Sequence, residues 1–360
     1  MIYEGAYMIS NKFPDSNNNI QSWPWTIQEK SVFSNSINWP KISIVTPSYN
    51  QGKYIEESIR SVLLQGYPNL EYIIIDGGSN DETLFIIKKY EPWITYWISE
   101  KDEGQSNAIN KGIAKCTGDI FNWLNSDDWY VQNAFYEVAT KFLADPKLEF
   151  ASGYENHIGL DGSISLYKGT YLRKNLEESI ELCEVAQPST FFKLDLVKEV
   201  QGVSADMHFI MDGEMWIKLL LLNGQNHFFK INKALVNFRF HDKSKTVSDL
   251  LLNNFSYERK CISADLQKFI GVPEKIISYF NWLGIEPDKI RKLNRTWNFN
   301  EKIISPEKLN HFFIKKYITR QFIEGNNKEA AYGIKQLIKN GAFDFFLAKN
   351  LLKLLLKTHQ

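Results

Sequence analysis

Between residues 41 and 124, short apolar runs typical of buried strands alternate with segments of helical periodicity. In the first such segment, Ile55, Ile59 and Leu63 recur on one side of a helix. Ser79 and Glu82 have the spacing of a capping box that opens the next helix. The strands are expected at 41–46, 71–75, 93–99 and 119–124, and the helices at 54–64, 79–90 and 105–116. This alternation predicts an α/β fold with a parallel, doubly wound sheet that binds ligands beyond the carboxyl ends of its strands.

Acidic residues follow two of the expected strands. Asp127 and Asp128 follow the apolar run 120–124 after Asn125 and Ser126, and Asp76 comes directly after the run 72–75. Carboxylates at the edge of a core are costly unless a cation neutralises them. An Asp pair suits Mg²⁺ or Mn²⁺, which prefer oxygen ligands and complete their shell with phosphate oxygens and water. The alternative is a helix cap beside a solvated acid, but two adjacent carboxylates favour a metal–diphosphate site.

The composition limits the partners and the compartment. Lys and Arg number 42 against 42 for Asp and Glu, a formal net charge of +0, whereas a general nucleic-acid binder would carry a basic excess. Cys116, Cys183 and Cys261 lie far apart, which favours reduced thiols in a cytoplasmic protein over a zinc site or disulfides. We see no N-terminal signal pattern and no apolar run of the roughly 18 residues that would span a bilayer.

Polar residues near the expected strand ends have both a structural and a functional interpretation. Thr46 and Ser48 follow the first strand as a turn and cap. Neither GxxxxGK[ST] nor GxGxxG occurs there, which disfavours an ordinary kinase or dehydrogenase. Gln105 and Asn110 belong to a helix that is either simply capped or aims polar side chains at a ligand. Asp212 lies in the first turn of a later helix, and taken alone it is best explained as an acid that complements the helix dipole.

Two short strands are also expected at 227–231 and 234–240, and His241 lies among cations after the second of them. Alone it would be a surface loop histidine. With Arg239, Lys243 and Lys245 beside it, the segment is also suited to clamping a diphosphate.

Several of these stretches match one protein family in the same order. They are 44–50, 76–81, 104–112, 125–128, 187–189, 212–216 and 239–241. Taken together, they resemble the inverting family 2 glycosyltransferases, which have the GT-A fold, over about residues 41–246. No single stretch would be specific. The sequence departs from the family where Asn125 replaces a frequent Asp and Met211 a frequent Glu.

The resemblance implies a role for each matching residue. Asp212 would be the catalytic base, and Asp128 and His241 would lie at a Mn²⁺ or Mg²⁺ ion. The nucleotide sugar would be bound by Thr46, Ser48, Asp76, Gln105, Asn110 and Asp127. Of these, Asp76 would contact the nucleotide base and Asp127 the ribose or the donor. Gln187 would lie near the acceptor or donor sugar, and Arg239 and Lys245 near the diphosphate.

The resemblance therefore implies a metal-dependent inverting glycosyltransferase of the hexosyltransferase type. It would move sugar from a nucleoside-diphosphate sugar to an oligosaccharide or lipid-linked acceptor, in bacterial surface-polysaccharide synthesis. The implied regions are an N-terminal extension at 1–40, a GT-A catalytic domain at 41–247 and a mainly helical C-terminal region at 248–360. The catalytic domain would comprise a nucleotide-binding half at 41–130 and an acceptor half at 131–247.

Two other functions are the alternatives. A nucleotidyltransferase with a related sheet would be expected to carry a Gly-rich basic loop after the first strand, which this sequence lacks. A non-catalytic nucleotide-sugar-binding protein is disfavoured because Asp128, Asp212 and His241 occur together.

The last residues are apolar with regularly spaced lysines. Lys349, Lys353 and Lys357 recur every four residues, which puts them along one face of a helix. Such a helix either lies on a membrane surface, at the inner face of the membrane, or packs on the catalytic domain or on a second copy in an oligomer. Both interpretations remain open.

Overall fold

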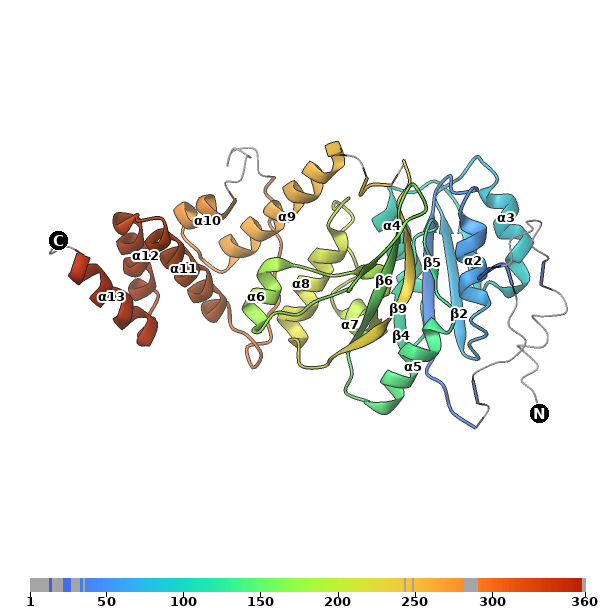
Figure 1. Cartoon of the computed structure of the whole chain (residues 1–360), viewed down its shortest axis with the longest axis horizontal. Coiled ribbons are helices and arrows are strands. Elements are labelled where there is room, and N and C mark those ends of the chain that lie inside the picture. The colour runs from blue at the N-terminus through green and yellow to red at the C-terminus, as the bar shows by residue number, and fades with distance from the viewer. Residues whose placement is uncertain are drawn as a thin grey trace. The chain divides into compact units, whose positions relative to one another are not determined.

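The protein is represented by a computed structural model that describes residues 13–14, 22–26, 33–34, 36–242, 244–247, 249–281 and 291–357 (Figure 1). The chain divides into two compact units. The first comprises Met1–Leu172, Glu184–Leu219 and Gln225–Leu252, and the second Arg173–Cys183, Leu220–Gly224 and Asn253–Gln360. The first is an α/β unit and the second is helical, so the predicted fold class is confirmed. The predicted division of the chain near residue 247 stays a prediction.

The first unit is built on a mixed sheet with the strand order β3-β2-β1-β4-β8-β6-β9-β5, and β7 pairs with β6. Its strands are β1 (Ile42–Ser48), β2 (Leu70–Asp76), β3 (Tyr96–Ser99), β4 (Ile120–Trp123), β5 (Trp129–Tyr130), β6 (Phe150–Ile158), β7 (Ile164–Tyr167), β8 (Thr190–Lys193) and β9 (Phe228–Arg239). β1 to β4 are mutually parallel. β8 is antiparallel to β4 and β6, whereas β9 is parallel to β6. The carboxyl ends of β1, β2 and β4 therefore share one edge of the sheet.

Helices cover both faces of this sheet (Figure 1). They are α2 (Ile55–Leu63), α3 (Thr83–Tyr90), α4 (Gln105–Lys115), α5 (Ala134–Ala144), α7 (Leu194–Glu199) and α8 (Met211–Asn223). Ile44 of β1 packs in a buried cluster with Ile55 and Ile59 of α2. On the other face, a Cβ added to Gly112 of α4 would come 2.4 Å from Val45 Cγ1. Only glycine allows α4 to lie this close to β1.

Three predicted details differ from the structure. β1 runs through Pro47 to Ser48, because β4 pairs with β1 only as far as Val45 and demands no amide hydrogen beyond it. The two short strands expected at 227–231 and 234–240 form the single strand β9, since a bulge opposite β6 absorbs the polar residues between them. The predicted capping box is wrong: α3 begins at Thr83 without a side-chain cap.

Three aromatic side chains of the N-terminal extension belong to the packed core of the first unit. Phe13, Phe33 and Trp39 are buried in the same cluster as the β1 and α2 side chains. The buried guanidinium of Arg60 donates hydrogen bonds to Pro14 O at 2.8 Å and Pro24 O at 3.1 Å. These contacts satisfy a buried charge with backbone carbonyls and hold the extension against α2.

The second unit consists of helices. They are α6 (Leu176–Leu182), α9 (Asp249–Phe269, whose first residues belong to the first unit), α10 (Glu274–Asn281), α11 (Pro306–Ile323), α12 (Asn327–Lys339) and α13 (Phe345–Lys357). α11 and α12 pack closely where Gly333 lies under Ile318 and Tyr317. The predicted mainly helical C-terminal region is confirmed. Over the part of the chain that the structure describes, no helix combines the length and apolarity needed to cross a membrane.

Candidate functional site

Asp127 and Asp128, which we call the acid pair, follow β4 and contact residues at the end of β9. His241 Nε2 lies 2.9 Å from Asp127 Oδ2. The backbone N–H of Arg239 donates to Asp128 Oδ1 at 2.9 Å, and the Arg239 side chain donates to Asp127 O at 3.0 Å. Four of the predicted site residues are thus in direct contact, although more than 100 positions separate the two pairs in sequence.

The environment of Asp128 disfavours a bare negative charge. Its side chain is 1% exposed. Burial raises its pKa well above the usual value, and the charges of Asp127 and Glu155 raise the pKa further. The hydrogen bond from Arg239 N lowers the pKa but does not offset these effects. A cation bound next to Asp128 would relieve this cost.

Arg239 connects the acid pair to α2. Its guanidinium forms an ion pair with Glu57 and lies over Trp129, with its Cζ 4.4 Å from a ring centroid. Burial raises the pKa of Glu57, and the Arg239 charge opposes that rise. Tyr54, at the start of α2, lies 4.8 Å from His241 between ring centroids. Arg239 is therefore fixed by an ion pair and by stacking, and its backbone presents an amide to Asp128.

A chain of hydrogen bonds extends from Asp128 toward α8. Asn125 Nδ2 lies 3.5 Å from Asp128 Oδ2, and Gln105 Nε2 donates to Asn125 Oδ1 at 2.8 Å. Lys245 Nζ donates to Gln105 Oε1 at 2.9 Å and to His208 O at 2.8 Å. The acid pair is thus linked, through α4, to the loop that precedes Asp212.

Asp212 lies half-buried in the first turn of α8. Its Oδ1 accepts a hydrogen bond from Gly213 N at 2.8 Å. Glu214 behind it is fully buried, accepts a hydrogen bond from Ser204 Oγ at 2.6 Å and pairs with Lys218 at 2.9 Å. These contacts fix the start of α8, and with it the position of the Asp212 carboxylate.

Asp76 ends β2 and organises the turn after it. Its carboxylate accepts hydrogen bonds from Ser79 N at 2.9 Å, Gly78 N at 3.1 Å, Ser79 Oγ at 2.5 Å and Ser99 Oγ at 2.6 Å. This explains why Ser79 does not cap α3. Ser48, opposite Asp76 in the register of β1 and β2, differs: its Oγ is buried with no hydrogen-bond partner in the described residues. An orphaned hydroxyl at a strand end is suited to a ligand contact.

Three other predicted site residues have structural partners. The Thr46 hydroxyl is buried and lies 3.1 Å from Tyr72 OH. The Asn110 amide forms hydrogen bonds of 2.7 and 3.0 Å with the backbone of Val203. Gln187 Nε2 donates to Asn122 Oδ1 and Trp123 O, at 2.7 and 2.8 Å. The structure brings none of the three into contact with the acid pair, and their ligand roles stay predictions.

Sequence reasoning missed residues that surround the acid pair. Glu57 and Tyr54 lie at the start of an ordinary amphipathic helix, and no local pattern distinguishes them. Glu155, by contrast, is a charged residue at a buried position of a strand, and that conflict was a signal in the sequence. It accepts a hydrogen bond from Ser189 Oγ at 2.9 Å and lies 3.1 Å from His157 Nε2.

The acid pair fits the implied divalent metal. Within the described ranges, no group of three or more His, Cys, Asp or Glu side chains is arranged to hold a metal. Mg²⁺ and Mn²⁺ need only one or two protein carboxylates when substrate phosphates and water complete their shell. Asp128 is a buried carboxylate with a raised pKa, and Asp127 is 21% exposed beside His241. This oxygen-rich set suits an ion that binds together with a diphosphate.

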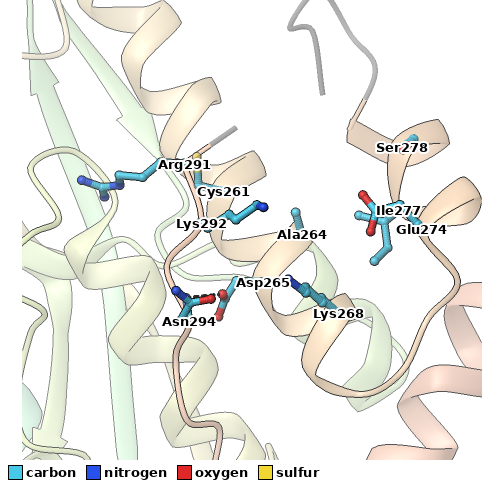
Figure 2. A pocket seen from close by; sticks show the side chains of 10 residues that line it. All are labelled: Cys261, Ala264, Asp265, Lys268, Glu274, Ile277, Ser278, Arg291, Lys292 and Asn294. Carbon is cyan, nitrogen blue, oxygen red and sulfur yellow. Dashed lines mark hydrogen bonds between the residues drawn. The ribbon is translucent and has the colours of Figure 1, made fainter. Parts of the chain in front are cut away.

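The second unit holds a cavity of about 220 Å³ between α9, α10 and the segment after residue 290 (Figure 2). Its lining includes none of the predicted site residues: it consists of Cys261, Ala264, Asp265, Lys268, Glu274, Ile277, Ser278, Arg291, Lys292 and Asn294. The Asp265 carboxylate accepts hydrogen bonds from Asn294 N and Trp297 Nε1, at 2.7 and 3.0 Å. Asp265 therefore orders the segment after residue 290.

Comparison with known proteins identifies the type of chain. The profile described as "Glycosyl transferase family 2" matches residues 43–199. An uncharacterized glycosyltransferase of Mycobacterium tuberculosis is 31% identical over 190 residues, covering 51% of this chain and 70% of that protein. A second uncharacterized glycosyltransferase, from Rickettsia typhi, is 29% identical over 219 residues, covering 58% of this chain. The chain spans 66% of the length of that rickettsial relative.

A solved structure gives an independent comparison of the fold. TarS of Staphylococcus aureus (residues 1–349, in complex with UDP-GlcNAc) has a TM-score of 0.50 to this protein. The two share 16% identity, and the match covers 84% of this chain and 82% of that one. At this identity the likeness concerns the fold alone, and it confirms the fold that the sequence resemblance implied.

Proposed function

This chain belongs to glycosyltransferase family 2, and on that premise we propose that it transfers a sugar from a nucleoside-diphosphate sugar to an acceptor hydroxyl, with inversion at the anomeric carbon. One observation carries the proposal: the hydrogen bonds that run from Asp128 through Gln105 and Lys245 to the loop before Asp212. These hydrogen bonds connect the acid pair to the start of α8, which supports one site that holds both the donor and the catalytic base Asp212.

The donor would bind along the carboxyl ends of β1, β2 and β4. The nucleoside would lie near Ser48, whose buried hydroxyl lacks a partner in the described chain. Asp76 would contact the nucleotide base only by exchanging some of its present hydrogen bonds. Asp127 would contact the ribose or the diphosphate, and Lys245 would add a positive charge beside it. This order follows the common rule that α/β sheets bind nucleotides outside their strand ends.

Asp212 would act as the general base. Its carboxylate would accept the proton of the acceptor hydroxyl while that oxygen forms a bond to the anomeric carbon, and the bond to the nucleoside diphosphate breaks on the opposite side. A positioned base contributes about 10²–10⁴-fold to such a reaction. The buried contacts of Glu214 would hold the Asp212 backbone in place, so that little reorganisation is needed at the moment of transfer.

Asp128 would hold Mn²⁺ or Mg²⁺, with His241 and Asp127 beside the ion. When bound, such an ion neutralises charge on the departing diphosphate. The protein would contribute the rest through its own groups: Arg239 orders Asp127 and donates its amide to Asp128, and the Glu57 ion pair keeps Arg239 in place.

The acceptor would be an oligosaccharide or a lipid-linked glycan of a bacterial surface polysaccharide. α13 supports contact with a membrane surface, because Phe345 is 83% exposed and Leu352, two turns later, is exposed on the same helical face. Lys349 lies next to them, and α13 contains no acidic residue. A basic, partly apolar helix of this kind binds anionic lipid surfaces.

The proposal is tested with a panel of UDP-, GDP-, ADP- and dTDP-sugars. We expect one donor class to raise the melting temperature only when Mn²⁺ or Mg²⁺ is present, and to release its nucleoside diphosphate slowly in water. If no donor raises the melting temperature with either metal, the proposed function is wrong. If a donor binds but is neither hydrolysed nor transferred to any oligosaccharide or lipid-linked acceptor, the chain is a nucleotide-sugar-binding protein.

A further inference from the structure

Four rings gather at the carboxyl ends of β6 and β9, beside the acid pair. His157 is stacked on Tyr167, with ring centroids 5.1 Å apart and planes 26° apart. The ring centroids of Phe238 and Phe240 each lie 5.3 Å from that of His157, and they lie 5.3 Å from one another. We call these four residues the aromatic platform.

The strand register puts the platform on one face of the sheet. His157 pairs with Phe238 in the parallel ladder of β6 and β9, and residues paired in this way point to the same face. Tyr167 pairs with Glu155, two residues before His157 and on that same face. Tyr167 is 44% exposed, and the other three rings are half-buried. The platform is thus partly accessible and lies at the border of the core, against which Phe238 packs.

His157 is held in a fixed orientation. Glu155 is buried, and its Oε2 lies 3.1 Å from His157 Nε2 while its Oε1 accepts a hydrogen bond from Ser189 Oγ. A carboxylate bonded to one ring nitrogen sets the orientation of the imidazole. The His157 side chain retains 23% exposure, so the ring presents both an apolar surface and a polar edge.

The platform is continuous with the candidate site. Phe240 directly precedes His241, which contacts Asp127. Glu155 lies near enough to Asp128 for its charge to affect that carboxyl group. In the strand order, β4 and β8 separate β6 and β9 from β1 and β2, which carry Ser48 and Asp76.

We propose that the platform is the acceptor subsite and that it binds a pyranose ring of the acceptor glycan; this rests on the proposed function. The C–H bonds on one face of a pyranose are apolar and carry a slight positive charge, so they pack against the negative face of an aromatic ring. The hydroxyl groups around the ring edge would meet His157, oriented by Glu155. An aromatic surface with a few convergent polar groups is the usual lining of a small-molecule site.

The test uses methyl pyranosides of glucose, galactose, mannose and N-acetylglucosamine as probes, followed by saturation-transfer NMR on the full chain. We expect ring C–H signals from at least one glycoside. Tyr167→Ala, on the exposed strand β7, should weaken that binding about tenfold, and Phe240→Ala should do the same. Phe229→Ala is the matched control, an exposed phenylalanine at the other end of β9, and should bind like the wild type.

Three results would overturn the subsite: no signal from any glycoside, equal binding by Tyr167→Ala and the wild type, or displacement of the glycoside by UDP. The melting-temperature shift with nucleotide sugar and metal is recorded on the same proteins. If that shift persists while the glycoside result is negative, only the subsite is wrong. If the wild type shows no such shift, the proposed function fails instead.

Discussion

His241 Nε2 lies 2.9 Å from Asp127 Oδ2, although the two residues are 114 positions apart in the chain. The contact joins the end of β9 to the acid pair after β4. It gives His241 a defined partner, so the histidine is a positioned group and not a loop residue in solvent. Removing either side chain should therefore disturb the proposed metal–diphosphate site more than the fold.

His241→Ala should raise the Mn²⁺ concentration needed for half-maximal transfer about 10–100-fold, the usual cost of losing a group that orients a metal ligand. Chelation with EDTA should abolish the metal-dependent activity. His227→Ala, in the turn just before β9, is the matched control and should leave the Mn²⁺ titration unchanged. An unaltered titration in His241→Ala would remove His241 from the metal site.

Arg239→Met should destabilise the protein by about 2 kcal/mol, because Glu57 loses its ion-pair partner while it remains largely buried. Glu57→Gln in the same background should recover part of the loss, which urea unfolding of the two single variants and the double variant measures. Simple additivity of the two changes would mean that the pair does not couple.

Glu71 gives a pH dependence of stability. Burial alone would raise its pKa, but hydrogen bonds from Ser43, Thr117 and Lys41 outweigh burial and lower the pKa from 4.5 to about 2. Because the folded-state pKa is the lower one, this stabilisation is present above pH 4.5 and is lost as the pH falls toward 2.

The unfolding free energy of Glu71→Gln should therefore fall less than that of the wild type between about pH 5 and about pH 3. The comparison with the wild type isolates Glu71 from the other carboxylates, which titrate in both proteins. An identical acid-induced loss in the variant would contradict the assignment.

Part of this site could be predicted from local sequence, for physical reasons. An apolar run followed closely by two aspartates predicts acids at a sheet edge, and the alternation of apolar runs with helical segments predicts the parallel strands β1 to β4. Both depend only on neighbouring residues. The Asp127–His241 contact depends on how β9 inserts between β6 and β5, which no local pattern encodes.

The same distinction explains why the predicted capping box is wrong. Ser79 has the spacing of a capping box, but Asp76 offers it a better partner, and the tertiary contact outweighs the local one. Asn110 and Gln187 also have backbone partners that only the folded chain supplies.

The exposed face of α13 should bind anionic membranes. The double variant Phe345→Glu/Leu352→Glu should lose co-sedimentation with phosphatidylglycerol vesicles, since it replaces apolar contact with repulsion. Phe85→Glu, at an exposed phenylalanine (74%) of α3, is the control and should still sediment. If the double variant changes the oligomeric state and not vesicle binding, α13 is an interface between copies of the chain.

The transfer rate of Asp212→Asn, measured with donor affinity on the same protein, tests the central claim most directly. The account predicts a kcat lower by about 10²–10⁴-fold with unchanged donor binding. Asp195→Asn, an exposed acid in the first turn of α7, should keep the wild-type rate. A full transfer rate in Asp212→Asn would contradict the account.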